Sequence, residues 1–346
     1  MIGLVPTPMN QPTPDRSVRS MPPRDAAGRA LPGSLAARFA GKRVGLALGS
    51  GSARGLAHIG VLRALVESGI RIDLVAGTSM GAFVGAMFAA GKLDELEKEF
   101  RNMGWQGIAS LVDPVFPRSG LIDGLKIGEF VRRHVAQPDI ESLPIPFRAV
   151  ATDISTGEEV AIESGNLIEA VRASIAVPGV FNPVRCNGRV FVDGGLVDPV
   201  PVGAARAMGA EVVIAVDLNH DIVTNRLTRP AADENGKPIV QAMTRVLENF
   251  QPLEHPMLIQ FREWLEREPL PGIVDVMLAS LYIMQARIAQ ATLQMDRPEV
   301  LIQPPLGAVR FLEFDQASDI IDIGYRSASE CLRKLEGAQP AGALEA

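Results

Sequence analysis

Residues 72–81 read Ile-Asp-Leu-Val-Ala-Gly-Thr-Ser-Met-Gly, a mainly apolar run that leads straight into a serine between two glycines. This order predicts a strand, a sharp turn at Ser79 and a helix over 80–90, which is the layout of a nucleophile elbow. The residue at such a corner takes a strained backbone conformation, and only very small neighbours such as Gly77 and Gly81 leave room for it. The first amides of the helix would point at the corner, where they stabilise charge on a substrate oxygen. The stretch therefore predicts an acyl-transfer site.

A glycine-rich loop lies one helix upstream of the elbow. The buried-strand pattern over 44–48 runs into Gly-Ser-Gly-Ser-Ala-Arg-Gly at 49–55, and apolar residues then recur at helical spacing up to Gly69. Such a unit presents backbone N–H groups to an anion. A dinucleotide fingerprint needs glycine where Arg54 stands, and a Walker loop needs a Gly-Lys-Ser or Gly-Lys-Thr that this loop lacks. The oxyanion of an acyl-transfer intermediate is the favoured ligand, and a purely structural turn is the alternative.

A third motif, Asp193-Gly194-Gly195, follows the strand-like run at 189–192. This tripeptide is more often an ordinary turn. Here the glycines would also let a buried carboxylate approach another loop, within hydrogen-bond reach of Ser79 Oγ. By itself the motif leaves both interpretations open.

In order and spacing, the three motifs resemble the patatin-like phospholipase family, and in particular its bacterial branch related to neuropathy target esterase. The resemblance runs from about residue 42 to about residue 218, and residues 173–181 look like the family segment that precedes its aspartate. It implies a patatin-like three-layer α/β fold, with a mainly parallel central sheet flanked by helices. It also implies a Ser-Asp dyad that needs neither cofactor nor metal.

The resemblance carries a role to each residue that matches a family motif. The catalytic pair is Ser79 as nucleophile and Asp193 as general base. The oxyanion hole is assigned to Gly51, Ser52, Ala53 and Met80. Supporting positions of the motifs are Gly49, Arg54, Gly55, Gly77, Gly81, Gly194 and Gly195.

One departure from the family pattern concerns the glycine loop. The family loop reads Gly-Gly-Gly-x-Arg-Gly, and this chain has Ser50 and Ser52 at its first and third positions. Serine keeps an N–H, so the hole can form, but any step that needs a glycine-only backbone angle there is in question. For Arg54 we favour a structural role over a direct electrostatic contribution.

The implied reaction has Asp193 accept the Ser79 proton, followed by an acyl-enzyme that water releases. Because aspartate is a weak base, we expect burial to raise its pKa or the oxyanion hole to carry much of the rate enhancement. The rival is an α/β-hydrolase triad of Ser79, Asp193 and His220. Too few elements precede the elbow for that fold, so we favour the dyad. We expect His58 to be a packing or helix-end residue and His134 a solvated helix end.

Composition sets the outer bounds. The 346 residues are 47% hydrophobic, which supports one large domain. A net charge of -6 makes nucleic acid an unexpected partner. The histidines and Cys186 and Cys331 are scattered, so no metal site is predicted, and so few cysteines suit a reducing cytoplasm. Prolines interrupt the first residues, and we expect no signal peptide. We therefore expect a cytoplasmic protein, with a peripheral place at the inner membrane surface left open.

We expect three segments: a disordered Pro/Arg-rich tail over 1–36, a patatin-like catalytic domain over 37–220, and helical additions and C-terminal elements over 221–346 packed on the same domain. The apolar stretch 72–91 fits strand, elbow and helix better than a membrane span. A candidate membrane-docking helix covers 256–267. Its apolar face consists of Met257, Leu258, Phe261 and Trp264, a pattern that a helix packed on its own protein shares.

Three functions remain open at this stage. The favoured one is a serine acyl hydrolase for phospholipids or lysophospholipids, with a general carboxylesterase as its nearest alternative. The second is a non-catalytic lipid-binding regulatory protein of the same fold. The third is the histidine-dependent α/β-hydrolase.

Overall fold

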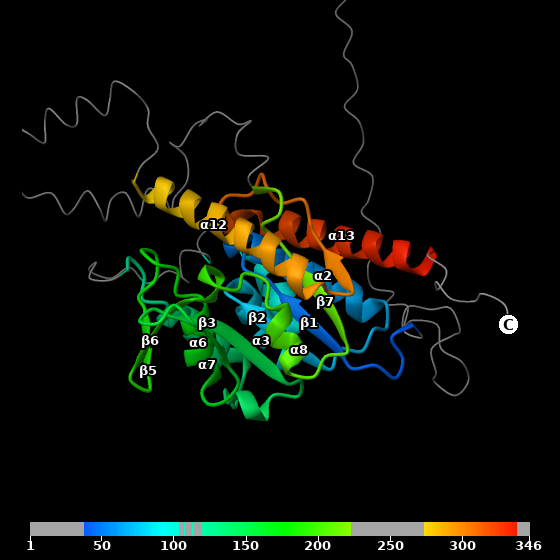
Figure 1. The fold of residues 1–346 in the computed structure, drawn as a ribbon, viewed down its shortest axis with the longest axis horizontal. Coiled ribbons are helices and arrows are strands. Elements are labelled where there is room, and N and C mark those ends of the chain that lie inside the picture. The colour runs from blue at the N-terminus through cyan, green and yellow to red at the C-terminus, as the bar shows by residue number, and fades with distance from the viewer. Residues whose placement is uncertain (1–37, 104–106, 108–112, 114–119, 223–272, 338–346) are drawn as a thin grey trace, which may run out of the picture.

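The apolar runs at 44–48 and before Ser79 form neighbouring parallel strands at the centre of one eight-stranded sheet (Figure 1). A computed structural model of the chain describes residues 38–103, 107, 113, 120–222 and 273–337. The strands in this part are β1 (Val44–Leu48), β2 (Leu74–Thr78), β3 (Phe147–Asp153), β4 (Glu159–Ile162), β5 (Val184–Cys186), β6 (Arg189–Asp193), β7 (Val212–Val216) and β8 (Val300–Ile302).

The sheet is mainly parallel, as predicted. Its order is β5-β6-β3-β2-β1-β7-β8, with β4 paired to β3. Five neighbouring strands, β3, β2, β1, β7 and β8, run parallel to one another. Strands β4 and β6 pair antiparallel with β3, and β5 pairs antiparallel with β6. Parallel sheets need cover on both faces. Accordingly, β1, β2 and β7 are buried at every position.

Helices cover both faces of the sheet and complete the predicted three-layer α/β fold (Figure 1). They are α2 (Ala57–Glu67), α3 (Met80–Ala89), α4 (Leu93–Asn102), α6 (Leu125–His134), α7 (Leu167–Ser174), α8 (Val202–Ala207), α12 (Ile273–Asp296) and α13 (Ala317–Gly337). Alternate residues of a strand point to opposite faces. Leu46 and Leu48 thus join the core with α2, α3, α7 and α13, whereas Ala47 joins the core with α8 and α12.

The C-terminal helix α13 lies directly on α2. A Cβ placed at Gly60 would overlap the Ile321 carbonyl, and one at Gly324 would overlap the Ala57 carbonyl, so the two backbones touch where the helices cross. The glycine loop leads into α2. Its position therefore depends on a helix more than 250 residues later in the chain.

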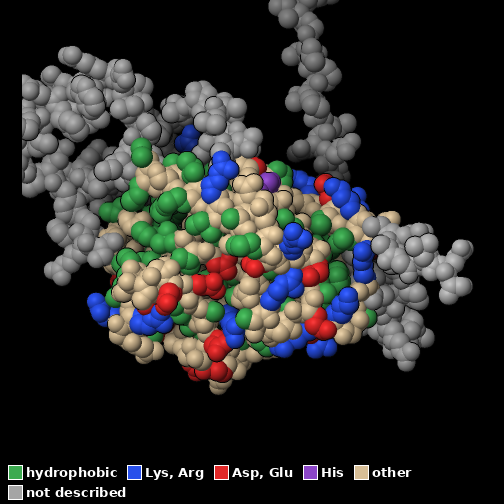
Figure 2. Space-filling view, viewed as in Figure 1, with side chains coloured by type: hydrophobic (Ala, Val, Ile, Leu, Met, Phe, Trp, Pro, Cys, Tyr) green, Lys and Arg blue, Asp and Glu red, His purple; other side chains and the backbone are tan. Residues whose placement is uncertain are grey.

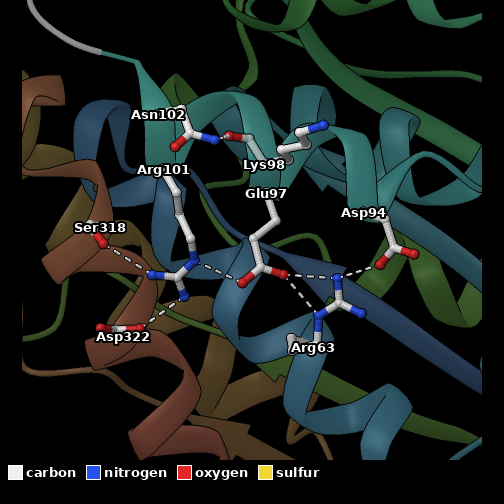
Figure 3. Close-up of polar contacts among 8 residues, drawn as sticks. All are labelled: Arg63, Asp94, Glu97, Lys98, Arg101, Asn102, Ser318 and Asp322. Atoms are coloured by element: carbon white, nitrogen blue, oxygen red, sulfur yellow. Dashed lines mark hydrogen bonds and ion pairs between the residues drawn. The ribbon is translucent and has the colours of Figure 1, made fainter. Parts of the chain in front are cut away.

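A polar network joins α2, α4 and α13 on the outer side of this layer (Figure 3). Arg63 of α2 binds Asp94 and Glu97 of α4 at 2.5 and 2.8 Å. Arg101 of α4 binds Glu97 at 2.9 Å and Asp322 of α13 at 2.8 Å. The network holds the three helices in register at the protein surface.

The long helix α12 has two different faces. Its inner face contributes Tyr282 and Gln285, which are buried. Its outer face carries Val276, Ile283 and Met284, each about half exposed, and Figure 2 shows hydrophobic side chains gathered over this part of the molecule. In the part of the chain that the structure describes, no helix combines the length and apolarity needed to cross a bilayer.

The C-terminal part of the described chain consists of a long helix from Ile273, a strand at 300–302 and a last helix from Ala317. β8 extends the sheet beside β7. The short strands β4 and β5 were not predicted, since β4 alternates little and β5 has three residues. The tail over 1–36 and the docking helix over 256–267 lie outside the described residues.

Candidate active site

The site forms where two strands end head to head. β4 lies along one edge of β3, opposite residues 149–152, so β2 and β6 must share the other edge. On that shared edge Thr78 pairs with Val150 and Asp193 pairs with Ala151, the next residue of β3. The sheet register thus brings the ends of β2 and β6 together, although more than 100 residues separate them in the sequence.

The elbow at the end of β2 is strained as predicted. Ser79 has φ 57° and ψ −124°, a positive φ that non-glycine residues rarely adopt. A Cβ at Gly77 would overlap the Gly81 carbonyl, and one at Gly81 would overlap the Leu48 carbonyl. Both predicted glycines are therefore needed for close backbone approach. The Ser79 N–H donates to Ser174 Oγ at 2.9 Å.

The base candidate is buried and close to the nucleophile. Asp193 is 1% exposed, and its Oδ1 accepts the Gly195 N–H at 2.7 Å. Burial raises the pKa of Asp193 to about 6, against the lowering effects of hydrogen bonding with the Ser79 hydroxyl and the Gly195 N–H. Within the described residues Oδ2 accepts no hydrogen bond of good geometry. The carboxylate therefore has an unused acceptor beside the serine.

Gly194 lets this segment fit against β3, and Gly195 lies beside Gln285 of α12. A Cβ at Gly194 would overlap the Val150 carbonyl, and one at Gly195 would lie 2.5 Å from Gln285 Nε2. The Thr152 hydroxyl donates to the Asp193 carbonyl at 2.9 Å. Close backbone approach thus explains Gly194, whereas Gly195 faces the ends of side chains.

The glycine loop lies against the start of α3, where a Cβ at Gly55 would overlap that of Met80. Among the described residues, the N–H groups of Gly51, Ser52 and Met80 have no backbone or side-chain acceptor. Three of the four N–H groups expected at an oxyanion hole are therefore available. The fourth is occupied, because Ala53 N–H donates to the Phe311 carbonyl at 3.1 Å.

The two serines that replace family glycines have partners of their own. Ser52 has φ 47°, and its hydroxyl donates to the same Phe311 carbonyl at 2.7 Å. The glycine-type angle therefore occurs at Ser52, supported by that hydrogen bond. Ser50 has no positive φ; its Oγ donates to Gln285 Oε1 at 3.2 Å and accepts from Asn219 Nδ2 at 3.0 Å.

Arg54 is fully buried. Its guanidinium lies 4.3 Å from the Tyr282 ring centroid, and Nη1 donates to the Val309 carbonyl at 3.5 Å. The N–H of Gly49, at the start of the loop, donates to the Val216 carbonyl at 3.0 Å. Both contacts join the loop to later parts of the chain.

None of the described histidines bonds to Ser79 or Asp193. His58 is buried and its Nε2 donates to the Gly49 carbonyl at 2.7 Å, while burial lowers its pKa to about 4. His220 Nδ1 lies 4.0 Å from Asp221. His134 was expected to be solvated, but its side chain is only 12% exposed, because the ring packs on Phe130 and binds Glu99. His255 lies outside the described residues.

A second acidic group lies near the site. Burial, reinforced by the charges of Glu159 and Asp296, raises the pKa of Asp198 to about 7. Thr78 Oγ1 donates to the Asp198 carbonyl at 2.9 Å, which ties this residue to the end of β2. In the described ranges, His, Cys, Asp and Glu side chains form no group of three or more suited to a metal ion.

Sequence reasoning missed Ser174, Gln285 and Asn219. Ser174 lies in the segment 173–181 that had been noted, but its hydroxyl had no assigned role. Nothing local marks the other two, because their partners lie 169 or more residues away in the sequence.

Comparisons with a family model and with known proteins point to the same family. Residues 46–206 match the model described as patatin-like phospholipase. An uncharacterized NTE family protein of Mycobacterium tuberculosis is 35% identical over 88% of this chain and 96% of its own length. Lysophospholipase NTE1 of Pyricularia oryzae is 31% identical over 88% of this chain, and patatin-like phospholipase domain-containing protein 6 of Homo sapiens is 28% identical over 84%. The chain spans about a fifth of each of these last two proteins.

Proposed function

This chain belongs to the patatin-like phospholipase family, and on that premise we propose that it cleaves fatty-acyl esters of phospholipids or lysophospholipids through a Ser79–Asp193 dyad. The observation that carries the proposal is the meeting of β2 and β6 on one edge of β3, which sets a strained serine beside a buried carboxylate. The name of the Pyricularia relative supports the lysophospholipid alternative.

In the proposed reaction Asp193 takes the Ser79 proton as Oγ attacks the ester carbonyl carbon. The N–H groups of Gly51, Ser52 and Met80 stabilise the oxyanion of the tetrahedral intermediate. The intermediate collapses to an acyl-enzyme when the alkoxide of the lipid leaves with the proton from Asp193. Water, deprotonated by Asp193, then releases the fatty acid and restores the serine.

The raised pKa of Asp193 supports its role as base. An ordinary aspartate holds a proton too weakly to remove one from a serine hydroxyl efficiently. A pKa of about 6 makes this carboxylate a stronger base that is still ionised at neutral pH. The free Oδ2 gives the serine proton a site to move to.

An apolar cluster beside the glycine loop supports a lipid substrate. It contains Phe311 and Tyr282, which contact the loop at Ser52 and Arg54. Its other buried members are Ile122, Val177, Val180, Ile222 and Leu278. We propose that this cluster borders the acyl chain. The alternatives are a general carboxylesterase and a lipid-binding protein without turnover.

We also propose peripheral contact with lipid. The outer face of α12 supports it, because Val276, Ile283 and Met284 are about half exposed there. The docking residues expected from the sequence, Met257, Leu258, Phe261 and Trp264, lie outside the described residues and stay a prediction.

The test is covalent labelling with a fluorophosphonate probe, together with fatty-acid release from phospholipid, lysophospholipid and short-chain ester substrates. We expect wild-type protein to label and to release fatty acid, Ser79→Ala to do neither, and Asp193→Asn to lose at least about 10³-fold in kcat. His220→Ala should keep full activity, since a dyad needs no imidazole. An inactive wild type would favour the lipid-binding alternative, and an inactive His220→Ala beside an active Asp193→Asn would establish the histidine triad.

A further inference from the structure

One turn of chain contacts the backbone of both proposed catalytic residues. Ser174, the last residue of α7, accepts the Ser79 N–H on its Oγ at 2.9 Å. Two residues later, the Ala176 carbonyl accepts the Asp193 N–H at 2.9 Å. Ser174 is fully buried. The turn at 174–176 therefore fixes the amides of the nucleophile and the base relative to each other.

The Ser174 hydroxyl stands in for a missing hydrogen bond of the sheet. Val75 N–H donates to Pro146 O across the β2–β3 ladder. In a parallel ladder the donor and acceptor positions advance together by two residues. The next donors on β2 would be Gly77 and then Ser79, and the partner of Ser79 would be Val150 O. Instead, the Ser174 Oγ–H donates to Val150 O at 2.5 Å while Oγ accepts the Ser79 N–H.

This insertion makes room for the base. Asp193 pairs with Ala151 on the same edge of β3, one residue beyond the end of β2. If β2 continued along β3, Ser79 would occupy the place that β6 needs. A hydroxyl bridging Ser79 N–H and Val150 O widens the strand separation at that point and satisfies both backbone groups, which would otherwise be buried without partners.

We propose that Ser174 is a positioning residue, whose hydroxyl replaces the last β2–β3 ladder bond and so sets the separation between Ser79 Oγ and the Asp193 carboxylate. This inference rests on the function proposed above. Ser174 contacts no reacting atom. Its influence on the rate passes entirely through the backbone amide of Ser79.

The test compares Ser174→Ala and Ser174→Cys with wild type and with Ser68→Ala. Ser68 is a control because its hydroxyl also donates to a backbone carbonyl, that of Ala64 at 2.8 Å, but at the far end of α2. Steady-state hydrolysis, the second-order rate of fluorophosphonate labelling and thermal unfolding are measured for each protein, with assays well below every melting temperature.

For Ser174→Ala we expect kcat to fall about 10- to 100-fold, because the Ser79 N–H loses its partner, with KM changed less than about twofold. Labelling should slow by the same factor as kcat. The pH midpoint should stay that of wild type, since burial of Asp193 is unchanged. Cysteine keeps the shape but is a weak acceptor, so Ser174→Cys should fold and give an intermediate loss. Ser68→Ala should match wild type in kcat and labelling.

The inference is overturned if Ser174→Cys equals wild type in kcat and labelling, or if either variant lowers only the melting temperature. A change confined to KM would also contradict it. These outcomes leave the proposed function intact, because Ser79→Ala would still abolish activity. A wild-type protein that neither labels nor hydrolyses lipid would overturn both.

Discussion

The two strand ends that meet on β3 bear different kinds of strain. At the end of β2 the strain is in the backbone, since Ser79 has φ 57° and depends on two glycines for room. At the end of β6 the backbone is ordinary, with Asp193 at φ −50° and ψ 130°. There the strain is electrostatic, because burial disfavours the ionised carboxylate and raises its pKa to about 6.

One site thus combines backbone strain at Ser79 with an unfavourably buried charge at Asp193, and the two depend differently on pH. Backbone strain persists at every pH. The desolvation of a carboxylate destabilises the folded protein only where the carboxylate is ionised. A pH series on variants of the two strand ends therefore separates the two contributions.

Gly81→Ala should give the largest effect, because it acts on the backbone end. Its Cβ would overlap the Leu48 carbonyl, which belongs to a fully buried central strand and cannot move aside. We expect a loss of about 4 kcal/mol or more in the free energy of unfolding, equal at pH 5 and pH 8. Chemical denaturation measures it.

Gly203→Ala is the control for that substitution. Its Cβ would meet only an Asp296 oxygen at 3.8 Å, and alanine favours the helix, so stability should rise by up to about 1 kcal/mol. A Gly81→Ala protein within about 1 kcal/mol of wild type would show that the elbow is not sterically locked.

Asp193→Asn should give the next largest effect on the free energy of unfolding. Unlike Gly81→Ala it should stabilise the protein, and the gain should depend on pH. The folded pKa of about 6 lies above the ordinary value of 3.8, so the contribution of this carboxyl to wild-type stability is greatest below about pH 4 and falls as pH rises to 6. The difference is about 3 kcal/mol, from roughly 2 pKa units at 1.36 kcal/mol each. Asparagine has no charge to desolvate, so the variant should be about 3 kcal/mol more stable at pH 8 and similar to wild type at pH 4.

Unfolding curves at both pH values check this prediction. Glu330→Gln, at an exposed position on α13, should change stability little at either pH. An Asp193→Asn protein that is less stable than wild type at pH 8 would mean that the carboxylate is not strained.

The pH dependence of hydrolysis should give a smaller effect. Because Asp193 must be ionised to accept a proton, kcat/KM should be flat above about pH 7, half-maximal near pH 6 and about tenfold lower at pH 5. Asp198 also has a raised pKa, of about 7, so Asp198→Asn is the discriminating control. It should keep the midpoint near 6. A midpoint that shifts in Asp198→Asn would assign the titration to Asp198 and not to Asp193.

Arg101→Ala should have the smallest effect, because it touches neither strand end. It removes the ion pair with Asp322 that joins α4 to α13, and the ion pair with Glu97 within α4, at a partly exposed surface (Figure 3). We expect a loss below about 1 kcal/mol that shrinks further at high salt, with kcat unchanged. A large fall in kcat would show that the packing of α13 on α2 reaches the glycine loop.

Prediction from sequence succeeded where structure is set locally. The elbow was readable because a strand, a serine flanked by glycines and a helix follow one another within about twenty residues, as was the glycine loop before α2. The solvated position expected for His134 was wrong, because Phe130 and Glu99 cover the ring from the same and a neighbouring helix.

The positions of the sharp bends follow from the sequence, because Gly77, Gly81 and Gly194 each leave room for another part of the backbone to come close. Only the tertiary structure decided what meets at those bends. The pairing of Thr78 and Asp193 with successive residues of β3, the Ser174 hydroxyl between Ser79 and Val150, and the Phe311 carbonyl on Ala53 all join distant residues. The physical reason is that sheet register and burial are properties of the packed chain. The pKa of Asp193 likewise follows from the water that packing removes.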